Sequence, residues 1–432
     1  MKTTQLAELI LRGSYDDTLK KLYAPDERTV EKQRRRYVKS IAEFEKLYGK
    51  DREVAIYSAP GRTEIGGNHT DHNMGIVIAA AVNIDVLCIV SKNDTDIINV
   101  YSEGFKELEP VNITDLEISE EQYGTTESII RGMCAGIINN GGKCGGFDAY
   151  ITSEVLQGSG LSSSAAFEVA IGAIINHEFC DSKFNAVEIA QIGQYAENAY
   201  FGKPSGLMDQ TACSVGSVIT IDFNDNSNPI VTPIEFDMAK YGLALCVINS
   251  GGSHADLTDD YAAIKKEMCA VANELGADYL GHLDKKVFIE NIPELRKKLG
   301  DRAVMRATHF YMECDRALAI RKAIENDDID AFLAKIIESG HSSFEYNQNA
   351  HNGSDVTYQP VGLALCMAQE MLQGKHAAWR LQGGGFAGTI QCFVDVNILD
   401  EFVAYMETVF GKDSCHILSI RNYGAIKVTD NI

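Results

Sequence analysis

Gly158-Ser159-Gly160-Leu161-Ser162-Ser163-Ser164-Ala165-Ala166 is the stretch that decides the fold. Its glycines allow the backbone to bend where a side chain would clash, and its serine hydroxyls supply hydrogen-bond donors. Apolar residues then recur at helical spacing from Phe167 to Ile175, which places the stretch at a helix N-terminus, where unpaired amides can bind an anion. The stretch predicts a phosphate cradle. The alternative is an ordinary serine-rich turn that caps a helix.

The composition is that of a globular protein with room for two domains. Hydrophobic residues make up 45% of the 432 residues and charged residues 23%, which is ordinary for a folded domain. A net charge of −22 would repel phosphate backbones and anionic lipids, so we expect neither nucleic-acid nor membrane partners. A bound phosphate must then be held locally, by amides, a cation or a metal.

Several features favour a cytoplasmic location. The eleven cysteines contain no Cys-x-x-Cys pair, which favours reduced thiols over disulfides or a zinc site. Residues 1–13 are charged and lack the apolar core of a signal peptide. The most apolar run, Met74 to Val90, contains Asn83 and Asp85 and is short for a bilayer span.

We divide the chain into residues 1–40, expected to be surface helices that precede the main fold, residues 41–238 and residues 239–432. In the second part we expect a strand, a turn, a polar glycine-rich loop and a pair of strands, in this order: Val54–Ser58, Ala59-Pro60-Gly61, Arg62–His72, and Gly75–Ala81 with Val86–Ser91. In the third part we expect long helices at Ala255–Gly276, Arg302–Asn326, Ile329–Ser339 and Pro360–Leu372, followed by the glycine cluster Gln382–Gly388.

Common nucleotide-binding signatures are missing from the sequence. It contains no Gly-x-x-x-x-Gly-Lys-Ser/Thr, no Gly-x-Gly-x-x-Gly after a strand with a downstream acid, and no protein-kinase motif set. A phosphate-binding function must therefore belong to another class of protein.

Phosphoryl transfer needs a phosphate cradle, a metal held by oxygen ligands, a positive group and a group that orients or deprotonates the acceptor. Ser164 and Glu197 are candidates for the metal, Arg62 for the positive group and Asp209 for the proton acceptor. Each has a simpler explanation. Glu197 could be a solvated helix acid, Asp209 a helix cap, and Arg62 a surface ion-pair partner. His69 and Asp71 could be turn formers.

The residues of these segments and their order along the chain resemble the motifs of a known family. Ala59 to Gly75 resembles the galactokinase motif Pro-Gly-Arg-Val-Asn-Leu-Ile-Gly-Glu-His-Thr-Asp-Tyr, and Gly158 to Ala166 resembles the loop Gly-x-Gly-Leu-Ser-Ser-Ser-Ala. Gln382 to Gly388 is similar to a third, glycine-rich motif, and Met208-Asp209-Gln210 to the segment that carries the base. The chain thus resembles the GHMP kinases, in particular the galactokinase branch, from about Ile41 to its end.

This resemblance implies an α+β fold of two domains with the active site in the cleft between them. It implies an ATP- and Mg²⁺-dependent kinase that phosphorylates the anomeric O1 hydroxyl of galactose. The partners are then two small molecules, the sugar and ATP. The oligomeric state is left open. The implied roles are as follows. Arg62 and Asp209 are catalytic; Asn68, His69, Thr70, Asp71 and Tyr261 bind the sugar; Ser102, Gly158, Ser159, Gly160, Leu161, Ser162, Ser163 and Ser164 bind ATP; Ser164 and Glu197 bind magnesium.

Two departures from the motif affect the expected substrate. Asn68 replaces a glutamate that in the family reaches the primary hydroxyl of the sugar, and His72 replaces a tyrosine. An amide tolerates either a hydroxyl or a carboxylate, so galacturonic acid or another galactose-like sugar is an alternative substrate. Ala387 replaces a motif glycine at small cost. An alternative of another class is a catalytically silent regulator that binds sugar and ATP.

Overall fold

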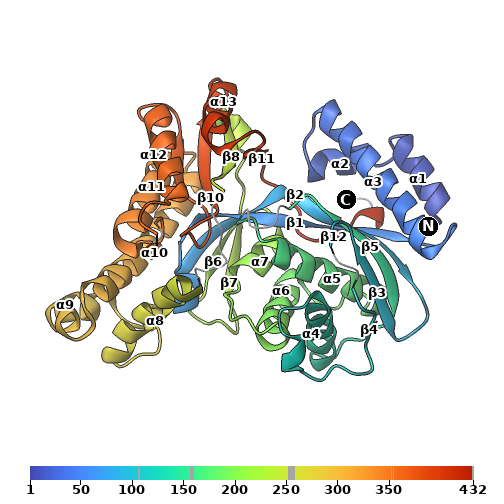
Figure 1. The fold of residues 1–432 in the computed structure, drawn as a ribbon, viewed down its shortest axis with the longest axis horizontal. Coiled ribbons are helices and arrows are strands. Elements are labelled where there is room, and N and C mark those ends of the chain that lie inside the picture. The colour runs from blue at the N-terminus through green and yellow to red at the C-terminus, as the bar shows by residue number, and fades with distance from the viewer. Residues whose placement is uncertain (106–107, 156–159, 252–257, 352, 354, 431–432) are drawn as a thin grey trace.

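The computed structural model describes residues 1–105, 108–155, 160–251, 258–351, 353 and 355–430. Two long antiparallel strands, β1 (Ala55–Gly66) and β2 (Ile76–Lys92), run through the centre of the molecule and connect its two halves (Figure 1). They belong to the sheet of the first half and also contact α10 (Asp301–Glu325) of the second half. Residues at the ends of β1 and β2 are therefore positioned by both halves of the chain.

The larger sheet contains strands of the first half and one strand from the C-terminal end. Its order is β12-β1-β2-β5-β3-β4, and β6 and β7 extend it beside β2. Besides β1 and β2, its strands are β3 (Ile97–Ser102), β4 (Val111–Asn112), β5 (Phe147–Ser153), β6 (Val218–Asp222), β7 (Ile230–Ile234) and β12 (Ile426–Lys427). Only β3 and β5 pair in parallel among the described strands.

Helices cover both faces of this sheet (Figure 1). Alternate side chains of β1 and β2 point to opposite faces. Tyr57 and Cys88 pack against one helical layer, whereas Ile56 and Leu87 pack against the other. The first layer comprises α4 (Thr126–Asn139), α5 (Ser163–Phe179), α6 (Ala186–Tyr195) and α7 (Met208–Val215); the second comprises α1 (Thr3–Leu11), α2 (Asp16–Leu22) and α3 (Glu27–Tyr48).

The helices expected in residues 1–40 are present, but they are not an extension that precedes the fold. They share a buried core with β1, β2 and β5, and α3 continues through residue 40 to Tyr48. They are one layer of the first half.

The second half has its own smaller sheet, with the order β11-β8-β10-β9. These strands are β8 (Leu243–Asn249), β9 (Ala378–Leu381), β10 (Thr389–Asp395) and β11 (Cys415–Leu418). Its other helices are α8 (Thr258–Glu274), α9 (Lys285–Leu299), α11 (Ile329–Ser342), α12 (Pro360–Leu372) and α13 (Leu399–Phe410). The four long helices expected from periodicity are confirmed to within a few residues. Pro360 begins α12, a position where proline loses no hydrogen bond.

Two local expectations around β1 and β2 are wrong. Ala59-Pro60-Gly61 is not a turn; it lies inside β1, and a bulge between Pro60 and Arg62 accommodates it. The two strands expected between Gly75 and Ser91 are one continuous strand, β2. At Gly61 a Cβ atom would lie 2.9 Å from the Leu161 carbonyl oxygen, so glycine lets the serine loop approach β1 closely.

Along the described parts of the chain, we find no helix whose length and apolar character would let it cross a bilayer.

Candidate active site

The guanidinium of Arg62 and the carboxylate of Asp209 form a bidentate ion pair. Nε and Nη2 of Arg62 donate to the two carboxylate oxygens of Asp209, each at 2.8 Å. Asp209 lies in the first turn of α7, where the helix N-terminus favours a negative charge. Burial raises the pKa of Asp209, but the charge of Arg62 and hydrogen bonds from Arg62 and Ser162 outweigh burial and lower the pKa overall. Asp209 is therefore ionised at neutral pH.

The serine loop closes over this pair. The Ser162 hydroxyl donates to Asp209, and Nη1 of Arg62 donates to the Gly160 carbonyl. The backbone N–H of Arg62 also donates to the Leu161 carbonyl at 3.0 Å. Ser162 adopts a left-handed conformation with φ of 59°, and α5 begins at the next residue. The helix expected after the loop is thus confirmed.

Not all of the expected phosphate loop can be described. Gly158 and Ser159 lie outside the described residues. Ser163 and Ser164 form the first turn of α5, where backbone amides have no partner within the helix. The part of the loop that is described is a helix N-terminus beside Arg62 and Asp209.

The glycine cluster Gln382–Gly388 touches both the serine loop and the His-Thr-Asp segment. Nε2 of Gln382 donates to the Gly160 carbonyl at 3.3 Å, and Nε2 of His69 lies 2.8 Å from the Gly384 carbonyl. At Gly384 a Cβ atom would lie 2.5 Å from the ring of Tyr261. The hydroxyl of Tyr261 donates to the Gly385 carbonyl at 2.6 Å. A glycine is therefore needed at 384 for the backbone to fit between α8 and the cavity.

His69 and His72 form a short relay of neutral rings. Because the Gly384 carbonyl can only accept, Nε2 of His69 donates and its Nδ1 accepts from Nε2 of His72 at 3.1 Å. Nδ1 of His72 in turn accepts from the Asn73 amide at 3.1 Å. Burial is the main cause that lowers the pKa of both histidines. The relay holds His69 in one tautomer.

Asp71 is a second carboxylate in the same cavity. Burial and, after it, the charge of Asp209 raise the pKa of Asp71 to about 6, although Lys265 and Arg62 act in the opposite direction. Its carboxylate lies directly against Gly206, where a Cβ atom would collide with it. Asp71 forms no ion pair within the described part of the chain.

Glu197 lies in a short π-helical turn, Ala196–Tyr200, beside another buried acid, Glu168 of α5. Nε2 of Gln210 donates to both carboxylates, at 2.9 Å to Glu197 and 3.0 Å to Glu168. Nζ of Lys203 donates to Oε1 of Glu197 at 2.7 Å. Burial and the charge of Glu197 raise the pKa of Glu168, and Oε1 of Glu168 is buried without a hydrogen bond.

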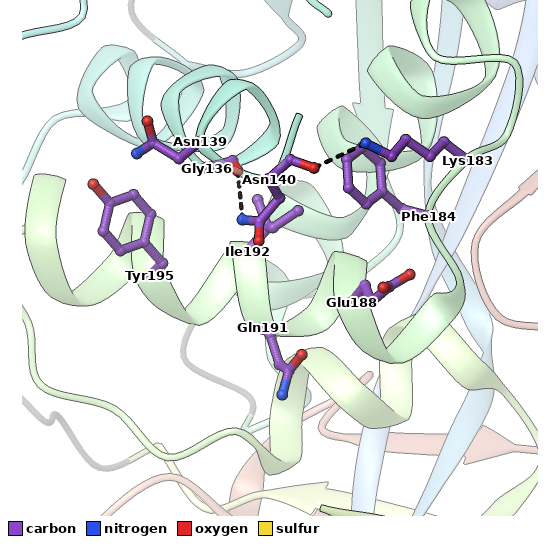
Figure 2. A pocket seen from close by; sticks show the side chains of 9 residues that line it. All are labelled: Gly136, Asn139, Asn140, Lys183, Phe184, Glu188, Gln191, Ile192 and Tyr195. Atoms are coloured by element: carbon purple, nitrogen blue, oxygen red, sulfur yellow. Dashed lines mark hydrogen bonds between the residues drawn. The ribbon is translucent and has the colours of Figure 1, made fainter. Parts of the chain in front are cut away.

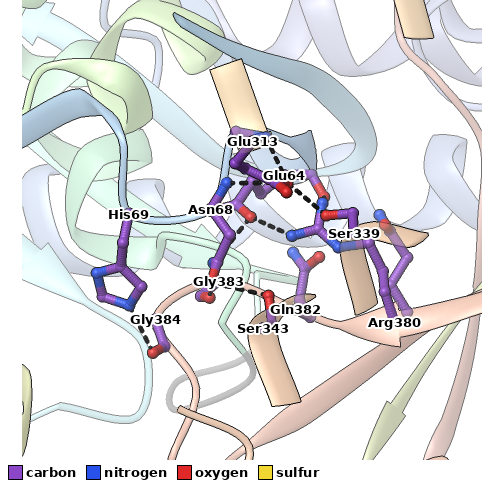
Figure 3. A network of polar contacts seen from close by, with 12 residues as sticks. Glu64, Asn68, His69, Glu313, Ser339, Ser343, Arg380, Gln382, Gly383 and Gly384 are labelled. Carbon is purple, nitrogen blue, oxygen red and sulfur yellow. Dashed lines mark hydrogen bonds and ion pairs between the residues drawn. The ribbon is translucent and has the colours of Figure 1, made fainter. Parts of the chain in front are cut away.

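Asn68 is completely buried at the edge of the cavity. Figure 3 shows its amide within a polar network that also contains Glu64, Glu313 and Arg380. Nδ2 of Asn68 donates to Oε1 of Glu64 at 3.0 Å and to the Gly383 carbonyl at 2.7 Å. Oε1 of Glu64 also accepts from Nη2 of Arg380 at 2.5 Å.

Thr70 and Ser102 lie away from the reacting groups. Oγ1 of Thr70 is 2.8 Å from the carbonyls of Gly67 and Ile76, so it stabilises the turn before β2. Ser102 is the last residue of β3 and pairs with Ile151 of β5, the strand that precedes the serine loop. Neither residue lines the cavity described next.

Six of the predicted site residues, Arg62, Asn68, His69, Asp71, Glu197 and Asp209, line a cavity of about 180 Å³. It is lined by Arg62, Glu64, Asn68, His69, Asp71, His72, Glu197, Lys203, Ser205, Gly206, Met208, Asp209, Gln210, Gly383 and Gly384. A larger cavity of about 370 Å³ lies between α4 and α6 (Figure 2). Its lysine, Lys183, is already bound to the carbonyls of Asn140 and Gly141, and no predicted catalytic residue lines it. The smaller cavity is the candidate active site.

Sequence reasoning gave no role to several polar residues of this region, among them Glu64, Glu168, Lys203 and Arg380. Glu64 had a signal, because it stands where the quoted motif has Asn. Arg380 had none, since it meets Glu64 across 316 positions of the chain.

Family models match two segments that contain most of the residues lining the site. The galactokinase galactose-binding signature matches residues 42–92, and the N-terminal domain of the GHMP kinases matches residues 128–217. A galactokinase from Actinobacillus pleuropneumoniae serotype 3 is 30% identical over 375 residues, which cover 86% of this chain and 91% of the relative. The chain belongs to the galactokinase family.

Other members and solved structures agree with this membership. The galactokinase of Streptomyces coelicolor is 28% identical over 85% of this chain and 91% of its own length. The crystal structure of Lactococcus lactis galactokinase complexed with galactose superposes with a TM-score of 0.76 at 22% identity, over 89% of this chain and 98% of that one. A mevalonate kinase superposes with a TM-score of 0.59 at 13% identity, over 84% and 98%. These likenesses confirm the expected α+β fold of the GHMP kinases.

Proposed function

We propose that this galactokinase family member transfers the γ-phosphoryl group of ATP to the anomeric O1 hydroxyl of galactose, giving galactose 1-phosphate and ADP. The observation that carries the proposal is the bidentate contact between Arg62 and Asp209 at the N-terminus of α5. A fixed cation and an ionised carboxylate thus lie beside backbone amides that have no partner within the helix. Phosphoryl transfer is catalysed mainly by such positioning and charge stabilisation.

In this mechanism Asp209 orients the O1 hydroxyl and accepts its proton as the bond to phosphorus forms. Its lowered pKa makes it a weak base before transfer, so orientation is its main contribution. Arg62 stabilises the negative charge that develops on the transferred group. Asp71 accepts hydrogen bonds from the other sugar hydroxyls. His69 would contact the sugar by releasing Gly384 or His72, which now occupy its two ring nitrogens. Tyr261 supports the glycine backbone that borders the cavity.

The phosphates of ATP would be bound by the loop from Gly158 to Ser164 and by the first amides of α5. Several of these groups already contact the catalytic pair: Gly160, Leu161 and Ser162. Because the protein carries a net charge of −22, amides and Arg62 must provide the local attraction. Ser102, at the end of β3, would contact a part of the nucleotide that lies outside the cavity.

Mg²⁺ is proposed as the metal, with Glu197 and Ser164 as protein ligands. The donor set fits this ion, because Glu197 offers hard carboxylate oxygens beside the orphaned Oε1 of Glu168. The described residues contain no cluster of three or more acidic, histidine or cysteine ligands, and Mg²⁺ is usually bound by one or two carboxylates with substrate phosphates. When bound, the ion would neutralise phosphate charge. Lys203 would then have to leave Oε1 of Glu197.

The main test measures turnover of the Asp209→Asn variant in a coupled assay that detects ADP release, with galactose as the phosphoryl acceptor. We expect kcat to fall by about 10²- to 10⁴-fold and KM for galactose to change much less, because the carboxylate orients and deprotonates the reacting hydroxyl and contributes less to holding the sugar. The control is Asp17→Asn, whose side chain is 95% exposed on α2. A kcat close to wild type for Asp209→Asn would refute the proposal.

The same assay separates the alternatives. Turnover of galacturonic acid in preference to galactose would change the substrate and keep the mechanism. Binding of galactose and ATP without ADP release would indicate a silent regulator, although Arg62, Ser162 to Ser164, Glu197 and Asp209 are all in place. The cytoplasmic location expected from the sequence stays a prediction.

A further inference from the structure

At positions 64 and 68, two side chains have changed places relative to the galactokinase motif quoted above. The motif has Asn where this chain has Glu64, and Glu where this chain has Asn68. The two side chains touch, since Nδ2 of Asn68 donates to Oε1 of Glu64 at 3.0 Å. The site therefore keeps one carboxylate and one amide, at exchanged positions four residues apart.

The amide of Asn68 has no capacity left for a ligand. Its two N–H groups are used by Glu64 and the Gly383 carbonyl. Its Oδ1 accepts from Asn349 at 2.9 Å and from Ser343 at 3.2 Å. The side chain is 0% exposed. A sugar hydroxyl could bind Asn68 only by displacing one of these partners, which would leave a buried polar group unpaired.

The carboxylate of Glu64 has the opposite character. Oε1 is fixed by Asn68 and Arg380, whereas Oε2 accepts no hydrogen bond from any residue that the structure describes. Glu64 is 3% exposed and lines the active-site cavity. Figure 3 shows it at the centre of the polar network, held by partners from both halves of the chain. One oxygen is thus anchored and the other remains free to accept.

The position of Glu64 along β1 indicates which part of a sugar it meets. Arg62, Thr63 and Glu64 pair regularly with β2, so Arg62 and Glu64 point to the same face, about 7 Å apart along the strand. Arg62 marks the end of the cavity where phosphoryl transfer would occur. Glu64 therefore faces the end of the sugar ring that is remote from carbon 1.

We propose that Glu64 is the carboxylate that selects the sugar: its Oε2 accepts a hydrogen bond from the hydroxyl at carbon 4 or carbon 6, and Asn68 is a positioning residue that holds Oε1. This inference rests on the proposed function for the identity of the reacting end. It also predicts that a uronic acid is rejected, because a sugar carboxylate at carbon 6 would face the negative charge of Glu64. Asn68 lacks the negative charge of the glutamate in the motif, and Glu64, whose side chain contacts Asn68, supplies that charge instead.

The test compares kcat/KM for galactose with that for 4-deoxygalactose, 6-deoxygalactose and galacturonic acid. We expect the wild type to prefer galactose over at least one of the two deoxy sugars by about 10- to 100-fold, the value of a hydrogen bond to a charged group. Glu64→Gln, which has the same shape, should reduce this preference to less than about threefold. It should also raise the relative activity on galacturonic acid.

The matched control is Asn68→Asp, again without a change of shape. It places a second carboxylate beside Glu64, so we expect a lower Tm and a similar loss of kcat/KM on every sugar, with the wild-type preference retained. If Asn68→Asp changes the preference while Glu64→Gln retains it, position 68 reads the sugar and the inference is wrong. Should Glu64→Gln not fold, Glu64→Asp keeps the charge beside Arg380 but withdraws Oε2, and it should lower the preference in the same way.

Binding separates this inference from the proposed function. If wild type releases no ADP with galactose, the proposed function fails, and the same preference is then measured as a ratio of Kd values by calorimetry. A loss of that ratio in Glu64→Gln would support the inference on its own. A ratio that Glu64→Gln leaves unchanged, or no binding of any of these sugars, would overturn it.

Discussion

Asp71 differs from Asp209 in its state of charge near neutral pH. Asp209 is held ionised by Arg62, whereas burial raises the pKa of Asp71 to about 6. An ionised Asp71 accepts hydrogen bonds from sugar hydroxyls, and a protonated one accepts fewer. We expect KM for galactose to rise as the pH falls from about 7.5 to about 5, and this rise to be absent in Asp71→Asn. An unchanged pH dependence in the variant would assign the titration to another group.

The raised pKa of Asp71 also has a consequence for stability. A carboxyl group whose pKa is higher in the folded state binds protons more tightly when folded, so its ionisation at neutral pH lowers the free energy of unfolding. Asp71→Asn is therefore expected to raise Tm at neutral pH although it weakens sugar binding. Such an opposition between stability and binding is typical of a functional site.

Gly206 is the residue whose missing side chain makes room for Asp71. A Cβ atom there would collide with the Asp71 carboxylate, so Gly206→Ala must move Asp71 or the loop before α7. We expect KM for galactose to increase by at least about tenfold, because a misplaced binding group loses its hydrogen bond. Gly362→Ala is the control, since its nearest neighbours would be 3.9 Å away. Equal effects of both variants would contradict this explanation.

At the scale of elements, the three N-terminal helices are a covering layer of the main sheet. Leu19 of α2 is 0% exposed within the core that they share with Ile56 and Leu87. We expect Leu19→Ala to lower the free energy of unfolding of the whole first half by about 2–5 kcal/mol. Leu11→Ala, at a site that is 60% exposed, should change it by less than about 0.5 kcal/mol. A separate early transition for the helices would show instead that they fold independently.

The elements that the sequence predicted well are those with a strong local pattern. A helix was expected to begin at the serine loop, as α5 does, and α12 was expected with its actual bounds, because their apolar spacing and their first residues are distinctive. Pro60-Gly61 suggested a turn but forms a bulge, since pairing with β2 overrides the local preference. The catalytic pair followed from the motifs, whereas the contact of Glu64 with Arg380 joins positions that no local pattern connects.

At the scale of the whole molecule, Glu313 of α10 ties the second half to the His-Thr-Asp segment of the first. Its Oε1 accepts from the backbone N–H of Gly67 at 3.1 Å and from the Ser339 hydroxyl, and its Oε2 accepts from Arg316. Burial raises the pKa of Glu313, but Arg316 and neighbouring donors outweigh it and lower the pKa overall. A lowered pKa stabilises the fold above the pKa of the unfolded chain and loses this effect in acid.

We therefore expect Tm of the wild type to fall as the pH decreases below about 4.5. Glu313→Gln should have a lower Tm at neutral pH, by an equivalent of about 3–5 kcal/mol, because it leaves Arg316 buried without its partner, and a weaker dependence on acid. Glu338→Gln is the matched control, since Glu338 also lies near Arg316, at 3.8 Å, but its side chain is 50% exposed. Calorimetry of the three proteins across this pH range checks the prediction. Parallel pH curves for wild type and Glu313→Gln would show that this carboxylate does not join the two halves.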